Sequence, residues 1–147
     1  MTDTLIKLFK RDLTKLKSEI RLYEDEADLW IIEKDISNSA GNLCLHIIGN
    51  LNHFIGATLG KTGYVRQRNA EFNLKDIPVK ELSKMIDDTV IVIRNVLEKL
   101  SNDDLIKIYP VKVFDEEMTT EFFLIHLVAH LNYHLGQINY HRRLLKK

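Results

Sequence analysis

Apolar residues recur at steps of three and four positions along four long segments of this 147-residue chain. In the first segment, residues 2–26, the repeating positions are Leu5, Phe9, Leu13, Leu16, Ile20 and Tyr23. This spacing places the apolar side chains on one face of an α-helix. Because a helix with one apolar stripe must bury it against another element, four such segments predict an all-α protein built as a four-helix bundle.

The other three helices have recognisable starts. They are expected over about residues 39–59, 78–100 and 119–145. The run Ser37-Asn38-Ser39 can cap the start of the second helix, and Pro78 suits the first turn of the third. Polar residues from Ser101 onwards break the third helix. No linker composition and no internal repeat interrupts the chain, so we expect residues 1–147 to form a single domain.

Two connecting segments lack the helical period. Residues 64–72 are polar, aromatic and charged, which predicts a structured loop. Residues 105–114 mix β-branched and aromatic residues with lysines, which favours a short extended segment or hairpin between the third and fourth helices. Pro110 argues against a central strand there, because proline has no amide hydrogen to donate.

Charge and length narrow the classes of function. The 21 basic and 21 acidic residues cancel, so the chain lacks the positive field that attracts nucleic acid or an anionic membrane. We therefore expect a small-molecule ligand, no nucleic acid and no membrane partner. The chain starts with the polar run Met1-Thr-Asp-Thr and has a single cysteine, Cys44, which predicts a cytoplasmic protein without an internal disulfide. A chain of this length can bury a core without a metal, so any metal is expected to serve function.

The fourth helix carries histidines one turn apart within an otherwise apolar run. His130 and His134 lie near the centre of its apolar arc, and His126 lies at the edge of that arc. On the second helix, His46 flanks the apolar stripe and Asn50 follows it by one turn. These positions favour convergence of His46, His130 and His134.

Three convergent imidazoles can hold a divalent metal and leave coordination positions for water or substrate. Imidazole ligands suit zinc, nickel or iron, and the residues do not separate these metals. The motif lacks the glutamate of His-Glu-x-x-His, so it supplies no general base of the protease type. Asp12 and Glu19 fall on the apolar arc of the first helix, where a carboxylate could orient a ligating imidazole.

Each of these patterns also has a plainer interpretation. Histidines on an apolar face are often core residues with a single hydrogen bond. Cys44 fits a small buried apolar residue better than a nucleophile. Arg66 and Arg68 fit a solvated loop somewhat better than an anion clamp, and Tyr133 and Gln137 can serve the hydrogen bonding of the core.

The chain also resembles a known family. An apolar second helix with His46, together with a fourth helix in which His130 and His134 precede Gly136-Gln137, resembles the DinB-like superfamily over essentially the whole chain. The runs 41–56 and 63–72 resemble a small-protein branch of it. The resemblance implies a DinB-like four-helix bundle with an unusual order of up and down helices, a divalent metal held by His46, His130 and His134, and a homodimer.

Some relatives in that superfamily are transferases or isomerases in which the metal activates a low-molecular-weight thiol such as bacillithiol, mycothiol or glutathione. The leading hypothesis is therefore a metal-dependent transferase that activates a small thiol toward an electrophile. Asn50, Tyr64 and Arg66 would then bind the polar cosubstrate. Two alternatives stay open, a metal-dependent hydrolase and a non-catalytic metal-binding protein of the stress response.

Overall fold

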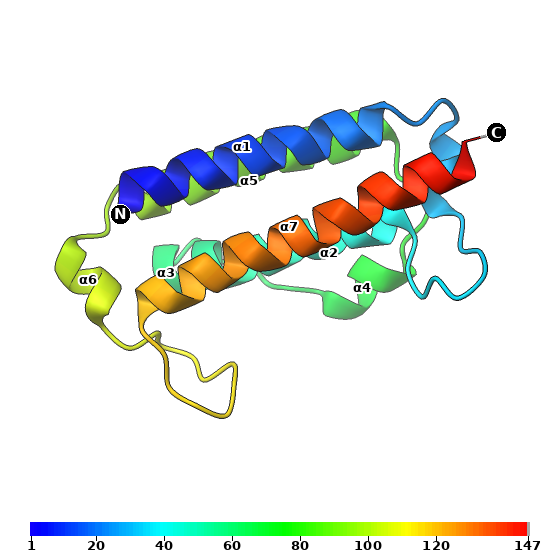
Figure 1. The fold of residues 1–147 in the computed structure, drawn as a ribbon. Coiled ribbons are helices and arrows are strands. Elements are labelled where there is room, and N and C mark those ends of the chain that lie inside the picture. Colours follow the sequence, from blue (N-terminus) through cyan, green and yellow to red (C-terminus); the bar gives the residue numbers. More distant parts are fainter. Residues whose placement is uncertain (147) are drawn as a thin grey trace.

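The computed structural model describes residues 1–146 as an all-helical protein (Figure 1). The long helices are α1 (Thr2–Arg21), α2 (Ala40–Leu51), α5 (Val79–Leu97) and α7 (Thr120–Leu145). A π-helical turn, η2 (Asn52–Ala57), and the short α3 (Thr58–Gly60) continue α2 without a break. The remaining short elements are a 3₁₀ turn, η1 (Glu26–Trp30), and the helices α4 (Arg68–Asn73) and α6 (Asn102–Ile106).

The long helices lie side by side. Helix α1 packs against α5 and α7, and α2 packs against α7, α5 and α4 (Figure 1). Side-chain caps fix two of the starts, since Ser39 accepts a hydrogen bond from the amide of Asn42 and Thr119 accepts one from the amide of Phe122. The site described below lies between α2 and α7.

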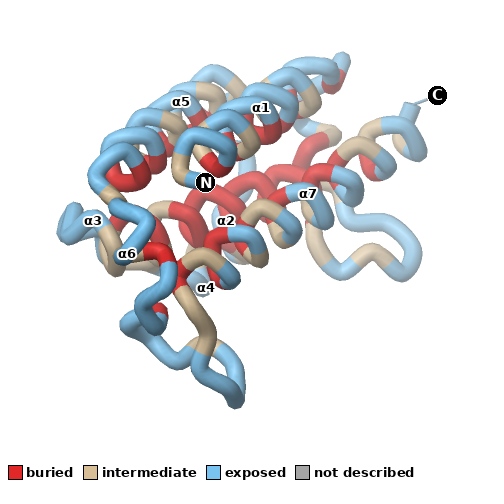
Figure 2. The backbone as a smooth tube through the Cα atoms, turned by 60° about the vertical axis from the view of Figure 1, so that its left-hand side comes forward, coloured by how far each residue is buried: buried red, intermediate tan, exposed pale blue. Residues whose placement is uncertain are grey.

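Helix α2 is buried on every side, whereas the sequence predicted a single apolar stripe. All residues from Ala40 to Leu51 are buried (Figure 2). Helices α4, α5 and α7 and the turn η1 all pack against this helix, so polar residues off its stripe are also enclosed. His46 and Asn50 therefore lie in the interior, with 7% and 6% of their surface exposed.

Two connecting segments differ from the prediction. The expected loop over residues 64–72 contains α4, because burial of Glu71 against α2 fixes a helical turn there. The segment after α5 begins with α6, which Ser101 and Asp104 start with a reciprocal capping box. The predicted extended pairing is limited, among residues 1–146, to one antiparallel bridge between Ile108 and Thr119.

The first helix ends earlier than the apolar period suggested. It stops at Arg21, and Asp25 then caps η1 by accepting a hydrogen bond from the amide of Ala27. Leu29 and Trp30 of η1 enter the core, which explains the change of direction. Over the part of the chain that the structure describes, no helix combines the length and the apolar character needed to cross a membrane.

Candidate metal centre

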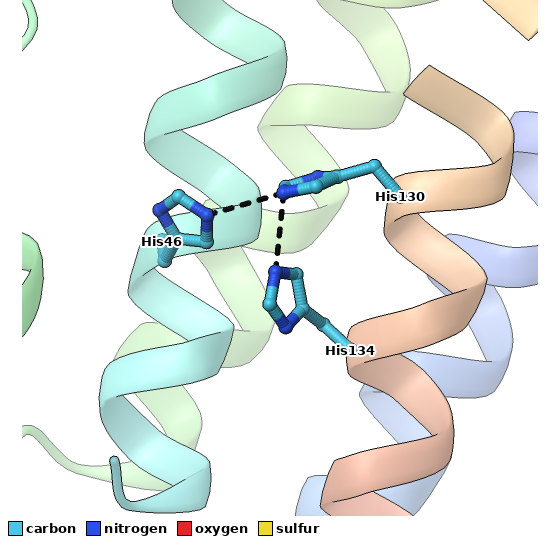
Figure 3. A group of neighbouring side chains, drawn as sticks. All are labelled: His46, His130 and His134. Atoms are coloured by element: carbon cyan, nitrogen blue, oxygen red, sulfur yellow. Dashed lines mark hydrogen bonds between the residues drawn. The ribbon is translucent and has the colours of Figure 1, made fainter. Parts of the chain in front are cut away.

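The structure brings the three predicted ligands together (Figure 3). His46 projects from α2, and His130 and His134 project from consecutive turns of α7. The Nε2 atom of His130 lies 3.3 Å from Nε2 of His46 and 3.1 Å from Nε2 of His134. One nitrogen from each of the three rings lies within 4.8 Å of the other two. His46 is buried and the other two rings are half-buried, so the group opens toward one side.

Hydrogen bonds at the outer ring nitrogens fix the tautomers of two ligands. Nδ1 of His46 lies 3.1 Å from a carboxylate oxygen of Glu71, and Nδ1 of His134 lies 2.7 Å from the amide oxygen of Gln137. Nη2 of Arg66 also lies 3.4 Å from Nδ1 of His46, but the Glu71 oxygen is nearer, so Nδ1 donates its proton to the carboxylate. Nδ1 of His134 likewise donates to the oxygen of Gln137. The Nε2 atoms of His46 and His134 therefore carry lone pairs directed toward His130.

The three Nε2 atoms that face one another have more lone pairs than protons between them. If His130 is neutral, it can place at most one proton among three Nε2 atoms. A cation satisfies all three lone pairs together. Two imidazole nitrogens on a tetrahedral zinc ion lie about 3.3 Å apart, given a zinc to nitrogen bond of roughly 2.0 Å. The two shorter separations match this value, so the residues fit a divalent metal.

The surroundings keep the ligands neutral. Burial, together with the neighbouring imidazoles of His134 and His46, lowers the pKa of His130 to about 4. Burial also lowers the pKa of His134, against the hydrogen bond to Gln137. A neutral imidazole is the form that binds a metal, so these ligands are ready at neutral pH.

Glu71 links His46 to Arg66 through its carboxylate. Its two oxygens accept hydrogen bonds from Nε and Nη2 of Arg66 at 2.9 and 3.0 Å, besides the one from His46. Burial alone would raise the pKa of Glu71, but the bonds from His46 and Arg66 outweigh burial and hold the pKa below its ordinary value. Glu71 is therefore an anion beside His46, and Arg66 balances its charge.

Gly49 makes this contact possible. A Cβ atom at position 49 would overlap the carboxylate of Glu71. Glycine is thus required at this point of α2 for α4 to approach closely enough for Glu71 to reach His46. Phe72, the next residue of α4, lies against the His46 ring with 5.0 Å between the ring centroids.

The three predicted cosubstrate residues lie in different surroundings. Arg66 is engaged by Glu71, and its guanidinium also lies 5.8 Å from the centre of the Phe54 ring. Asn50 is buried, and its Oδ1 atom has no hydrogen-bond partner among the described residues. Tyr64 is partly exposed, and burial of the remainder raises the pKa of its hydroxyl. Contact of these residues with a cosubstrate stays a prediction.

The remaining histidines lie outside the triad. His126 packs against Phe114 and Phe123, and its ring centroid lies 6.3 Å from that of His130. His141 is buried, with Nδ1 2.7 Å from the hydroxyl of Tyr23 and Nε2 2.8 Å from the carbonyl of Ile31. These two hydrogen bonds fasten the end of α7 to the segments on either side of η1.

Comparison with known proteins adds one result. A family model described as "Protein of unknown function (DUF1572)" matches residues 3–147, nearly the whole chain. The chain belongs to this family. No curated protein matches it.

In this DUF1572 chain, the partners of the two acidic residues of α1 differ from the prediction. Asp12 accepts a hydrogen bond from Asn132 at 2.7 Å, and Glu19 accepts bonds from Asn139 and Arg142 at 2.7 and 2.9 Å. Neither carboxylate contacts a ligating histidine in the hydrogen bonds of residues 1–146. The prediction was wrong because helical phase shows that a side chain points inward but does not identify its partner.

The residues that support the ligands are instead Glu71 and Gln137. From the sequence, Glu71 was expected in a loop and Gln137 was expected to serve the hydrogen bonding of the core. One signal was available for Glu71, since a carboxylate followed by phenylalanine in a short polar segment suggests an anchored turn. Cys44 is a small buried residue, as the sequence predicted. Complete burial raises the pKa of its thiol to about 12 and leaves the thiol unreactive.

Proposed function

We propose that this protein is a metal-dependent transferase of the DinB-like type that joins a small thiol to an electrophile. His46, His130 and His134 would hold the metal. The observation that supports this is the convergence of three Nε2 atoms, two of which have their ring protons fixed on the opposite nitrogen. A divalent ion such as zinc, nickel or iron would supply Lewis acidity and favour the thiolate form of a low-molecular-weight thiol.

The charges of the protein favour an anionic cosubstrate. The three proposed ligands are imidazoles, which carry no charge when they bind a metal, and the negative charge of Glu71 is balanced by Arg66. Among residues 1–146, the carboxylate that contacts the triad therefore brings no uncompensated negative charge that would repel an anion. In the proposed reaction, the thiolate sulfur forms a bond to the electrophilic carbon, the leaving group departs with the bonding electron pair, and the thiol proton goes to solvent.

One contact favours the transferase over the alternative of a hydrolase. Hydrolysis of the protease type uses a general base within reach of the attacking water. Glu71 is the carboxylate that contacts the triad, and both of its oxygens are already occupied by His46 and Arg66. A thiol needs no such base once it is ionised, so the geometry suits thiol chemistry better.

The proposed cosubstrate contacts involve three residues. The unpartnered Oδ1 of Asn50 would accept a hydrogen bond from the thiol compound, and Tyr64 would contact its polar end. Arg66 retains Nη1 for a carboxylate, because only its Nε and Nη2 bind Glu71. We further propose that the four long helices form the four-helix bundle of the DinB-like superfamily.

The test combines metal analysis with a transfer assay. Protein purified without added metal would be analysed for zinc, nickel and iron, and then assayed with glutathione, mycothiol and bacillithiol against several soft electrophiles. We expect a rate above that of free metal, which His134→Ala abolishes and the matched control His126→Ala retains. Metal binding by the triad without a rate above free metal for any thiol would favour the non-catalytic alternative.

A further inference from the structure

Helix α4 is too short to hold its own position. It contains six residues, Arg68–Asn73, whereas isolated helices shorter than about 12 residues are marginal in water. It lies beside α2 (Figure 1) and carries Glu71, whose carboxylate contacts the ring of His46. Contacts with the rest of the chain must therefore place α4, and this placement decides whether Glu71 reaches His46.

One stripe of α2 faces α4. Asn42, His46 and Gly49 are four and three positions apart, which puts them on the same side of the helix. Asn42 donates hydrogen bonds to the backbone of α4 and of the residue that follows it. His46 contacts the Glu71 carboxylate, and Gly49 leaves room for that carboxylate. The stripe therefore combines a proposed metal ligand with two residues that bring the partner of this ligand close.

The side-chain amide of Asn42 is fully engaged in the interior, where the residue is 1% exposed. Its Nδ2 atom donates to the carbonyl oxygens of Glu71 at 2.9 Å and Leu74 at 2.8 Å. Its Oδ1 atom accepts a hydrogen bond from the Ser39 hydroxyl at 2.6 Å. The opposite amide orientation would direct an oxygen at two carbonyl oxygens, so the partners define the orientation. Asn42 thus pairs two carbonyl groups that the end of a short helix leaves free.

These two hydrogen bonds attach the backbone of α4 to α2. Among residues 1–146, no other hydrogen bond joins the backbone of residues 68–74 to α2. Arg66 also binds Glu71, but it precedes Glu71 by only five positions. Its bonds therefore hold the local segment together and do not by themselves fix that segment against α2. The position of the Glu71 backbone depends on Asn42, one turn before His46.

We propose that Asn42 is a positioning residue of the metal centre. Through the backbone of α4, it holds the Glu71 carboxylate at Nδ1 of His46 and so fixes the tautomer and ring orientation of this ligand. The inference rests on the metal site of the proposed function and is independent of transfer activity. Residues that orient a ligating histidine typically change metal affinity 10-fold to 100-fold when they are replaced. Asn42 acts one step further out, so we expect the lower end of this range.

Zinc affinity of Asn42→Ala, measured by competition with a chromogenic chelator, tests the proposal. We expect it to fall about 10-fold. The matched control is Asn52→Ala on the continuation of α2. Nδ2 of Asn52 also donates two hydrogen bonds, to the Ile48 carbonyl and the Thr89 hydroxyl at 2.9 Å each, and neither partner belongs to α4. Both variants should lower the urea midpoint, but Asn52→Ala should keep wild-type zinc affinity. An equal loss of affinity in the two variants would overturn the proposal.

A double variant separates positioning from general destabilisation. If Asn42 acts through Glu71, Asn42→Ala should change the zinc affinity of Glu71→Ala by less than about 2-fold, because the carboxylate that it positions is already absent. A full further loss in this background would show that Asn42 supports the triad by another route, which contradicts the proposal.

The tautomer of His46 gives a readout that requires no metal. In the metal-free wild type, the nitrogen NMR shifts of the imidazoles should place the proton on Nδ1 in His46 and also in His134, whose partner is Gln137. Asn42→Ala should shift His46 toward the Nε2 tautomer and leave His134 unchanged. An unchanged His46 would overturn the proposal. A wild type that binds no zinc but shows this change would refute the metal site of the proposed function and uphold the role of Asn42 toward His46.

Asn42→Asp is a second variant of nearly the same shape, for use if Asn42→Ala does not fold. Aspartate suits the third position of α2, because Ser39 caps that helix. It places an oxygen opposite the carbonyl groups of Glu71 and Leu74, where Nδ2 of asparagine donates. We expect the same loss of zinc affinity and the same change at His46. Wild-type behaviour of Asn42→Asp in both measurements would refute the positioning role.

Discussion

Replacing Gly49 by alanine should remove Glu71 from the metal centre without altering any ligand. The added Cβ would overlap the Glu71 carboxylate, so the carboxylate must leave its position beside Nδ1 of His46. His46 then loses the partner that fixes its tautomer and ring orientation. Loss of such a partner typically weakens metal binding 10-fold to 100-fold, or about 1.4–2.8 kcal/mol. We expect Gly49→Ala to weaken zinc binding within this range.

The structure provides a matched control at Gly136. A Cβ atom there meets nothing within 4 Å, so Gly136→Ala should leave zinc affinity unchanged and stabilise α7 by about 1 kcal/mol. Both affinities can be measured by competition with a chromogenic chelator, and the absorption spectrum of bound cobalt would report a changed ligand geometry. The reasoning is refuted if Gly49→Ala binds zinc as tightly as wild type while His134→Ala does not bind it. Glu71→Gln keeps an acceptor for His46 and should weaken binding less than Glu71→Ala.

Three further predictions concern stability. His130→Ala should abolish zinc binding but keep the helical circular dichroism of the wild type, because the apolar core does not include the triad. An unfolded variant would show that the triad is needed for folding. The metal-free protein should lose stability as the pH falls from about 6.5 toward 4. The folded pKa of His130 lies below the ordinary value, so the unfolded chain takes up the proton first. Urea unfolding across this range should show a smaller loss in His130→Ala, and not its complete absence, because the lowered pKa of His134 contributes to the same loss. Burial alone would raise the pKa of Glu19, but hydrogen bonds from Arg142 and Asn139 outweigh it and lower the pKa. Glu19→Gln should therefore cost roughly 1–2 kcal/mol at neutral pH and progressively less as the pH falls below about 4.5, and an equal cost at pH 3 would contradict this.

The histidine triad could be predicted because helical phase is a local property. His130 and His134 are four positions apart, so any helix over residues 119–145 puts them on one face. His46 required only one more inference, that the two apolar helices pack against each other. The same local reasoning located the four long helices and the cap of the second helix at the Ser37–Ser39 run. The burial of α2 on all sides was missed, because an apolar pattern does not show how many neighbours a helix will have.

The sequence by itself determined that this chain is helical and which histidines face inward, since both follow from the spacing of residues a few positions apart. Tertiary structure alone decided what supports them. Glu71 is 25 positions from His46, and it reaches the ring only because α4 folds back onto α2 at Gly49. Asp12 and Glu19 were correctly directed inward, yet they contact Asn132, Asn139 and Arg142 rather than the ligands. A partner is chosen by the packing of distant segments, and periodicity contains no information about that choice.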